Sequence, residues 1–438
     1  MLSTIRNFNI GLYEEHLEEA SFLHGQRAAL LHDDNIPWCS LAPFEDRLET
    51  HLDALVVGGD VALTVCRRRC VEGDAGEVFA AISVFSRHLR PDLVASALAS
   101  VDASQSERLD AIADALKENI PPIWIDFVER ALLRGEPKLA RILAQVAAYR
   151  RLPVSGALCC FSAVQGIHSE AIAVALGRLP CCNSVGLLRD LLRSKDEGVR
   201  DAAALALLRT GVCDHLGSTK ETWAGLAGPR DAAAQFLAKD TGQNSCRLEA
   251  VGLAGDPRQI EILLACLADP GLADTAAWAL DTLTGARLYE SRFVEAPVNE
   301  DELSERERMA WKENDNPPRR YDGAPYGQLQ QQLSTDPVAW SQWLSARRPN
   351  FANGHRYRSG LPMSPAVLAG NLMDPRSGRR VREFAAEELA IRYGCPVPFE
   401  TSMPVARQLR ALQGIQQWVE AEAGRFIVGE WYFAGKAQ

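Results

Sequence analysis

The chain has 438 residues, of which 47% are hydrophobic and 24% charged, so a folded protein with a substantial core is expected. The formal net charge of −10 disfavours a surface whose main task is to neutralise phosphates, and we therefore expect no nucleic-acid partner. No apolar stretch approaches the roughly 20 residues of a membrane helix, and the first residues lack the apolar segment of a signal peptide. The sequence thus predicts a cytoplasmic protein without a membrane contact.

Residues 1–150 form a helical region that carries an internal duplication. The segment Asp46–Leu55 matches Glu107–Leu116 at an offset of 61 residues, and the same offset aligns Val78–Ile82 with Leu139–Leu143. A shared offset over two helical segments predicts a repeated unit of several helices.

Residues 151–285 contain a second repeat. Asp196–Leu207 matches Asp269–Leu280 at an offset of 73, and the pattern returns in Asp374–Ala390, with a degenerate copy expected around Gly228–Ala234. Each Asp is expected to cap the following helix, and the central Ala residues are expected to let the neighbouring helix approach closely. One helix pair cannot bury its apolar face alone, so the pairs must stack and leave a broad outer groove for a macromolecular partner.

The amino-acid composition changes in residues 286–363, which combine charged and turn-forming residues with many aromatic ones. A disordered linker rarely holds so many aromatic residues, so we expect an ordered insertion packed across the array. Within it, Asp336–Leu344 begins like a capped helix with Pro337 in its first turn. Residues 364–438 are predicted to form a C-terminal helical repeat, and Phe426–Phe433 a short strand or hydrophobic tail.

Residues that could carry chemistry give little sign of a catalytic or metal site. We interpret Cys159-Cys160 and Cys181-Cys182 as core thiols, because zinc ligands are usually separated by two residues. Cys66 and Cys70, four residues apart on an expected helix, could share a metal-ligand face. Because three arginines lie between them, we favour an exposed helix face. No phosphate-binding loop, dinucleotide-binding glycine pattern or nucleophile elbow occurs. We therefore expect no catalytic residue, no metal and no cofactor.

The compact polar segment Gly354–Pro362 has two interpretations. Its arginines could bind an anion, but a structural turn with surface arginines is the interpretation that we favour.

The Asp-turn repeats, in which Val199-Arg200 or Val381-Arg382 precede paired alanines, resemble the short HEAT repeat shared with phycobilisome-lyase-type proteins. The resemblance is clearest over Ser184–Gly285 and Asp374–Gly394. Together with the Trp340/Trp343 helix and the Gly354–Pro362 segment, it makes the whole chain similar to a bacterial HEAT-repeat family encoded beside type VI secretion spike and effector genes. This implies an all-α, HEAT-like α-solenoid of stacked antiparallel helix pairs with an irregular, aromatic-rich insertion.

The same resemblance implies an accessory role, as a non-catalytic adaptor or chaperone for a type VI secretion effector or its associated proteins. As protein-binding residues we predict a set drawn from the insertion: Trp311, Tyr321, Trp340, Trp343, Arg356, Tyr357 and Arg358. Alternatively, these aromatic side chains simply seal the side of the array.

Two other functions stay open. One is an immunity protein that neutralises a secreted toxin. The other is an enzyme on a HEAT scaffold, such as a bilin lyase or a DNA glycosylase. The acidic balance disfavours a glycosylase, and the lack of His-Glu dipeptides removes the metal ligands of HEAT-like iron enzymes.

Overall fold

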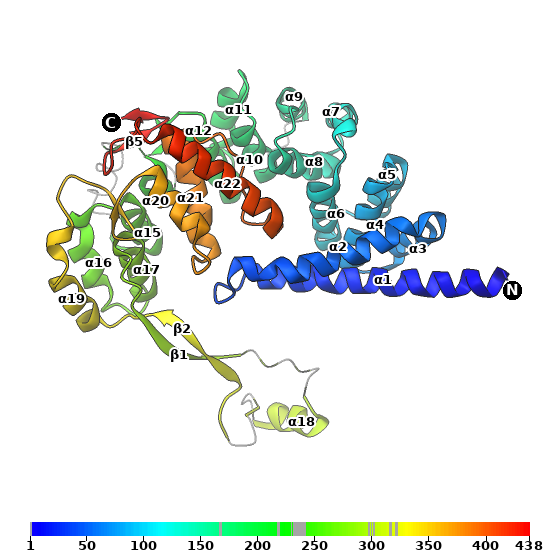
Figure 1. The fold of residues 1–438 in the computed structure, drawn as a ribbon, viewed down its shortest axis with the longest axis horizontal. Helices are drawn as coiled ribbons and strands as arrows, with labels where there is room; N and C mark the ends of the chain where they lie inside the picture. Colours follow the sequence, from blue (N-terminus) through cyan, green and yellow to red (C-terminus); the bar gives the residue numbers. More distant parts are fainter. Residues whose placement is uncertain are drawn as a thin grey trace. The chain divides into compact units, whose positions relative to one another are not determined.

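The computed structural model describes residues 2–165, 169–216, 220–228, 230, 242–296, 298, 300, 303–314, 318–319 and 323–438. The chain is predominantly helical and divides into two compact units (Figure 1). Unit 1 contains residues 1–241 and 362–438, and unit 2 contains residues 242–361. Among the described residues, no helix is both long and apolar enough to cross a membrane.

The first part of unit 1 is a succession of helices that pack in chain order. They are α1 (Leu2–Leu30), α2 (Ala42–Val57), α3 (Gly59–Glu72), α4 (Ala75–Arg87), α5 (Pro91–Ser100), α6 (Ser106–Asn119), α7 (Ile125–Arg134), α8 (Pro137–Arg150), α9 (Ser155–Gln165), α10 (Glu170–Arg178), α11 (Ser184–Leu191), α12 (Glu197–Arg209) and α13 (Glu221–Ala227). Helix α4 packs on α6, α6 on α8, α8 on α10 and α10 on α12, while α7, α9 and α11 form a second row (Figure 1). A continuous apolar core runs between the rows.

The C-terminal part of unit 1 consists of α20 (Pro365–Met373), α21 (Arg379–Tyr393) and α22 (Val405–Glu422). Helix α20 packs on α21 and α22, and α22 also contacts α2. The chain then forms the antiparallel pair β5 (Tyr432–Phe433) and β6 (Lys436–Ala437). The predicted terminal strand is therefore a two-residue strand in a small hairpin.

Small residues set the spacing of the repeated helices, as the sequence predicts. A Cβ on Gly177 in α10 would lie 2.6 Å from the Cα of Ala206 in α12. In unit 2 a Cβ on Gly252 would lie 2.7 Å from the Cα of Ala279, which occupies the matching place in the 73-residue repeat. Both helix pairs thus approach until backbone meets backbone.

The two repeat aspartates behave differently. Asp196 is the N-cap of α12, and its side chain accepts a hydrogen bond from the Val199 amide, as expected. Asp269 instead accepts from the Gly271 amide within a turn, and the following helix begins only at Ala273. The second cap predicted from the repeat is therefore wrong, because the extra turn separates Asp269 from the helix start.

Unit 2 contains the helices α15 (Ser245–Ala254), α16 (Ile260–Cys266), α17 (Ala273–Thr284), α18 (Glu305–Asn314) and α19 (Pro337–Ser345). It also contains strands that the all-α expectation lacks. Strand β1 (Tyr289–Glu295) pairs antiparallel with β2 (Gly327–Leu333), with Tyr289 opposite Leu333. The pair of two-residue strands β3 (Tyr357–Arg358) and β4 (Leu361–Pro362) ends the segment.

The compact units divide the chain at other positions than the sequence-derived segments. Helix α8 packs on both α9 and α10, so packing continues through residue 150. Helices α15–α17 pack with β2, β3 and α19 and thereby group with the insertion. Most of the degenerate repeat copy around Gly228–Ala234 lies outside the described residues.

Candidate functional site

Three successive helices of the row, α8, α10 and α12, end in arginine. Arg150, Arg178 and Arg209 are the last residues of α8, α10 and α12, and Arg151 caps α8. A cation at this position is stabilised by the partial negative charge of the helix C-terminus. These four residues, which we call the arginine row, lie along one face of unit 1.

The C-terminal part of unit 1 docks on this row through two glutamates. Glu400 accepts from Arg151 at 2.9 Å and from Arg178 at 2.7 Å. Glu387, on α21, accepts hydrogen bonds from the Nε and Nη2 atoms of Arg209, at 2.7 and 2.8 Å. Among the described residues, three arginines therefore pair with two glutamates, which is an excess of one positive charge.

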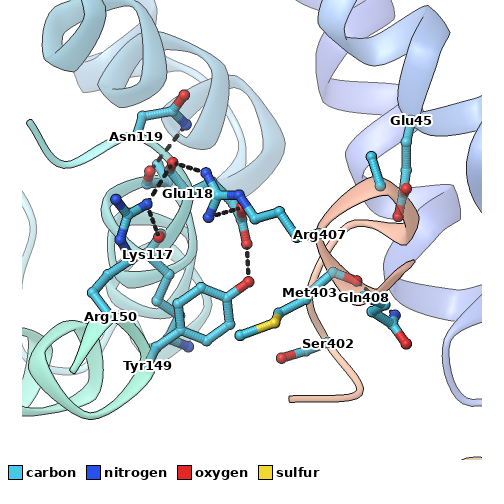
Figure 2. Close-up of polar contacts among 12 residues, drawn as sticks. Glu45, Lys117, Glu118, Asn119, Tyr149, Arg150, Ser402, Met403, Arg407 and Gln408 are labelled. Carbon is cyan, nitrogen blue, oxygen red and sulfur yellow. Dashed lines mark hydrogen bonds and ion pairs between the residues drawn. The ribbon is translucent and has the colours of Figure 1, made fainter. Parts of the chain in front are cut away.

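The cluster in Figure 2 joins α6, α8 and α22. The Glu118 carboxylate accepts a hydrogen bond from the Tyr149 hydroxyl and pairs with Arg407 at 2.9 Å. Arg407 also donates to the Glu118 carbonyl at 2.7 Å, and Arg150 donates to the same carbonyl at 3.2 Å. Burial raises the pKa of Glu118, although Arg407 opposes this, and burial beside Glu118 raises the pKa of Tyr149.

A third contact fixes the start of α22. The backbone amide of Val405, the first residue of that helix, donates to Glu45 at 2.6 Å. Arg27 holds the other oxygen of Glu45 at 2.7 Å and donates to the Ser402 carbonyl at 2.8 Å. A carboxylate from α2 thus caps a helix that follows it by hundreds of residues, where the helix dipole favours an anion.

Between these contacts the docked segment leaves two cavities in unit 1. The first measures about 390 Å³ and is lined by three arginines and a mainly apolar wall: Arg151, Gly177, Arg178, Arg209, Ala386, Leu389, Ala390, Gly394, Cys395, Pro396, Val397, Pro398, Phe399 and Ile415. We call it the arginine cavity. The second measures about 510 Å³, is bordered by Arg178 and Glu400, and has polar side chains of both signs. Residues of the C-terminal part of unit 1 thus line both cavities.

Three of the predicted contact residues are committed to internal contacts of unit 2. Trp340 is fully buried, and its indole donates to the Ser334 carbonyl at 2.6 Å. Arg356 and Arg358 are buried, and both donate to the carbonyl of Leu253 at the end of α15, at 2.9 and 3.2 Å. The expectation of surface arginines in Gly354–Pro362 is thus wrong, because these cations satisfy the carbonyls of a helix end.

The other predicted contact residues differ from one another. Tyr357 is buried against Phe351, and its hydroxyl accepts from the Ala352 amide. Trp343 is partly exposed and stacks under the guanidinium of Arg347 at 4.7 Å. Trp311 is partly exposed on α18, and Tyr321 lies outside the described residues. Of the described members of the set, Trp311 and Trp343 are the most exposed to solvent.

Some cysteines are more buried than the sequence predicts, and others are more exposed. Cys66 and Cys70 are buried in the core of unit 1 rather than on an exposed face, and burial raises the pKa of both thiols. Cys159 is a core thiol as predicted, but its neighbour Cys160 is exposed, and so is Cys182. In the described part of the chain, no group of three or more His, Cys, Asp or Glu side chains is placed to hold a metal ion.

Sequence reasoning did not find the arginine row, although a signal for it exists. A basic residue lies in the last turn of successive helices of one row at intervals of about 30 residues, beginning with Arg87 and Lys117. This spacing is about half of the 61-residue offset and would have predicted a line of cations on successive helices. The glutamates that meet the row carry no such periodic mark.

Comparisons with known proteins find no protein family, no curated protein and no solved structure that matches the chain. The site must therefore be interpreted from its own geometry.

Proposed function

We propose that the chain is a HEAT-like α-solenoid that acts as a non-catalytic, protein-binding scaffold. The sequential packing of α4, α6, α8, α10 and α12 into one row supports this, because such rows give extended surfaces on which a partner can lie. The repeated close approach of glycine to alanine between neighbouring helices, at Gly177 and Gly252, supports a repeat architecture as well.

The arginine cavity is the observation that carries the proposal. In the described part of the chain its three guanidinium groups pair with two carboxylates, while the opposite wall is apolar. This combination suits a protein segment that places an acidic side chain beside apolar ones, since the acid would balance the remaining charge and the apolar groups would bury surface. The partner in this proposal is a protein that presents such a segment.

We propose no catalytic step in this cavity. Cys395 lines it, but burial raises the pKa of that thiol, which therefore stays neutral at ordinary pH. The adaptor or chaperone role toward a type VI secretion effector rests on the sequence resemblance alone. An immunity role would share the binding surface and differ only in protecting a cell that expresses the toxin.

A comparative capture experiment tests the proposal. The tagged full chain, an Arg178→Ala variant and an Arg193→Ala control are used to capture proteins from the native cytoplasm. Arg193 is 80% exposed and pairs with Asp190, whereas Arg178 borders both cavities. Arg151 still holds Glu400 in the Arg178→Ala variant, so docking of the C-terminal part should persist.

We expect one protein to be retained by the wild type and the control and to be at least about tenfold depleted with Arg178→Ala, which corresponds to one lost charged contact. If all three chains retained the same amount of this protein, the arginine cavity would not be its binding site. Purification of the chain alone, with a stoichiometric small molecule or metal, would contradict the scaffold function itself.

A further inference from the structure

Two cysteines of unit 1 touch each other although 22 residues separate them. The Sγ atoms of Cys159, on α9, and Cys181, in the turn between α10 and α11, lie 3.4 Å apart. A disulfide joins its sulfurs at about 2.05 Å, so they need to approach by only about 1.4 Å, a shift within the reach of side-chain rotation. Both thiols are free in this structure.

The turn that carries Cys181 is held in place by Ser184. The Cys181 amide donates to the Ser184 hydroxyl at 2.9 Å, and the Ser184 amide donates to the Cys181 carbonyl at 3.1 Å. The same hydroxyl lies 3.2 Å from the Cys181 sulfur, and Ser184 is fully buried. The sulfur is therefore oriented by a rigid polar contact at the start of α11.

The two thiols differ in reactivity. Burial would raise the pKa of Cys181, but hydrogen bonds from the Ser184 side chain, the Asn183 amide and the Cys159 thiol bring it below its ordinary value. Burial raises the pKa of Cys159 to about 12, so this thiol keeps its proton and donates it toward its partner. Cys181 is also partly exposed, whereas Cys159 is buried, so of the two it is Cys181 that can react with a disulfide from solution.

We propose that Cys159 and Cys181 form a thiol–disulfide exchange site that reacts with low-molecular-weight disulfides of the glutathione type. Cys181 ionises, and its thiolate attacks one sulfur of oxidised glutathione. The S–S bond of that molecule breaks, and the first glutathione leaves as a thiolate, which takes up the proton released by Cys181. The Cys159 sulfur then attacks Cys181, its proton passes to glutathione, and a second reduced glutathione leaves. The protein loses two electrons and two protons, and one oxidised glutathione becomes two reduced ones.

The product would link α9 to the turn before α11 and close a loop that contains α10. Such a bond restricts the unfolded chain and should raise the midpoint of thermal unfolding. It is reversible by excess thiol, as expected of an exchange site rather than of a permanent structural bridge.

The test uses two full-length double variants. Cys160→Ser/Cys182→Ser keeps the proposed pair and changes two exposed positions, and Cys159→Ser/Cys181→Ser is the matched control that keeps the exposed neighbours. Each is incubated with oxidised glutathione, the remaining thiols are alkylated in denaturant, and tryptic peptides are identified by mass spectrometry. Circular dichroism verifies that both variants fold.

We expect the first variant to yield the peptides 152–178 and 179–189 joined by a disulfide, without a glutathione adduct, at a level at least about tenfold above that of the control. In a single Cys159→Ser variant, Cys181 should accumulate as the mixed disulfide with glutathione. A glutathione adduct on Cys181 without linkage, equal linkage in the control, or no reaction would each overturn the proposal.

Discussion

The buried Arg392 and Arg356 donate hydrogen bonds to backbone carbonyls at the ends of helices. Arg392 and its partner Glu388 are both completely buried, at 3.1 Å from each other. Arg392 also donates to the carbonyls of Gly225, Leu226 and Gly228, which terminate α13. One cation therefore satisfies several carbonyls that the helix itself leaves unpaired.

Replacing Arg392 by Leu should lower the free energy of unfolding by about 3–5 kcal/mol, because Glu388 and the carbonyls would lose the buried cation that pairs with them. Denaturant unfolding followed by circular dichroism measures this. The control is Arg425→Leu, which removes a largely exposed pair with Glu422 and should cost no more than about 1 kcal/mol. Equal losses in the two variants would contradict the structural role of Arg392.

His24 gives unit 1 a dependence on pH. Its ring stacks on Phe79 with the centroids 3.7 Å apart. Burial lowers the pKa of His24 to about 4; Asp114 and Asp74 oppose the shift, and Arg27 adds to it. The folded chain therefore binds this proton less tightly than the unfolded chain, whose histidine titrates near 6.5.

The contribution of His24 to the free energy of unfolding is therefore largest above pH 6.5. It falls as the pH drops from about 6.5 to about 4, because the unfolded chain takes up the proton in this range and the folded chain does not. The contribution of His24 reaches at most about 3 kcal/mol. In a His24→Gln variant this part of the pH dependence should vanish, which unfolding curves at pH 4.5, 5.5 and 7 can check. A variant with an unchanged slope, or a His24 resonance that titrates near 6.5, would refute the assignment.

Among the elements, the α10–α12 contact depends on the absence of one methyl group. Gly177→Ala would push a Cβ to within 2.6 Å of the Cα of Ala206, and neither backbone can yield without moving its helix. Gly186, in α11, offers a matched control because a Cβ there meets nothing within 4 Å.

We expect Gly177→Ala to destabilise unit 1 by about 1–3 kcal/mol. Gly186→Ala should stabilise it by about 0.5–1 kcal/mol, since alanine favours the helix. Thermal unfolding of the two variants compares them directly. Opposite signs are the predicted outcome, and stabilisation by both substitutions would mean that the helices do not touch at Gly177.

Local signals predicted much of the element structure. The caps at Asp196 and Asp336, the Pro start of α19 and the small residues between repeated helices follow from short-range chemistry. Strands β1 and β2 were missed because they pair across an insertion, and Gln328, Gln330 and Gln331 give β2 no apolar alternation. Pairing of this kind depends on distant partners that a local pattern does not contain.

For the whole molecule, the contacts that dock the C-terminal part of unit 1 lay beyond sequence reasoning. Arg209 and Glu387 are 178 residues apart, and Arg151 and Glu400 are 249 residues apart. Each residue alone is typical of a solvated helix face, and only the fold brings them together. Trp340 and Tyr357 were proposed as contact residues from their aromatic character, but both are buried. Their burial, too, depends on the fold and cannot be deduced from the neighbouring sequence.

The pair Arg209–Glu387 makes this docking sensitive to acid. Burial alone would raise the pKa of Glu387, but Arg209, with help from Arg178 and Arg151, holds it below its ordinary value of 4.5. A depressed carboxyl pKa contributes stability above pH 4.5 that is lost as the pH falls through the lower, folded value.

At pH 7, Glu387→Gln should lower the free energy of unfolding of unit 1 by about 1–3 kcal/mol. The difference from the wild type should narrow below pH 4.5, since the wild-type carboxyl then also becomes neutral. Denaturant unfolding at pH 7 and at pH 3.5 measures both values. A difference that stays constant would show that the charge of Glu387 is not what docks α21 on the arginine row.

Hydrogen exchange of the full chain, alone and with the protein that it captures, tests most directly whether the arginine cavity receives the partner. We predict slower exchange at the ends of α8, α10 and α12 and in residues 394–399, with little change in α18 and α19. Protection confined to α18 and α19, around Trp311 and Trp343, or no protection at all, would contradict the account.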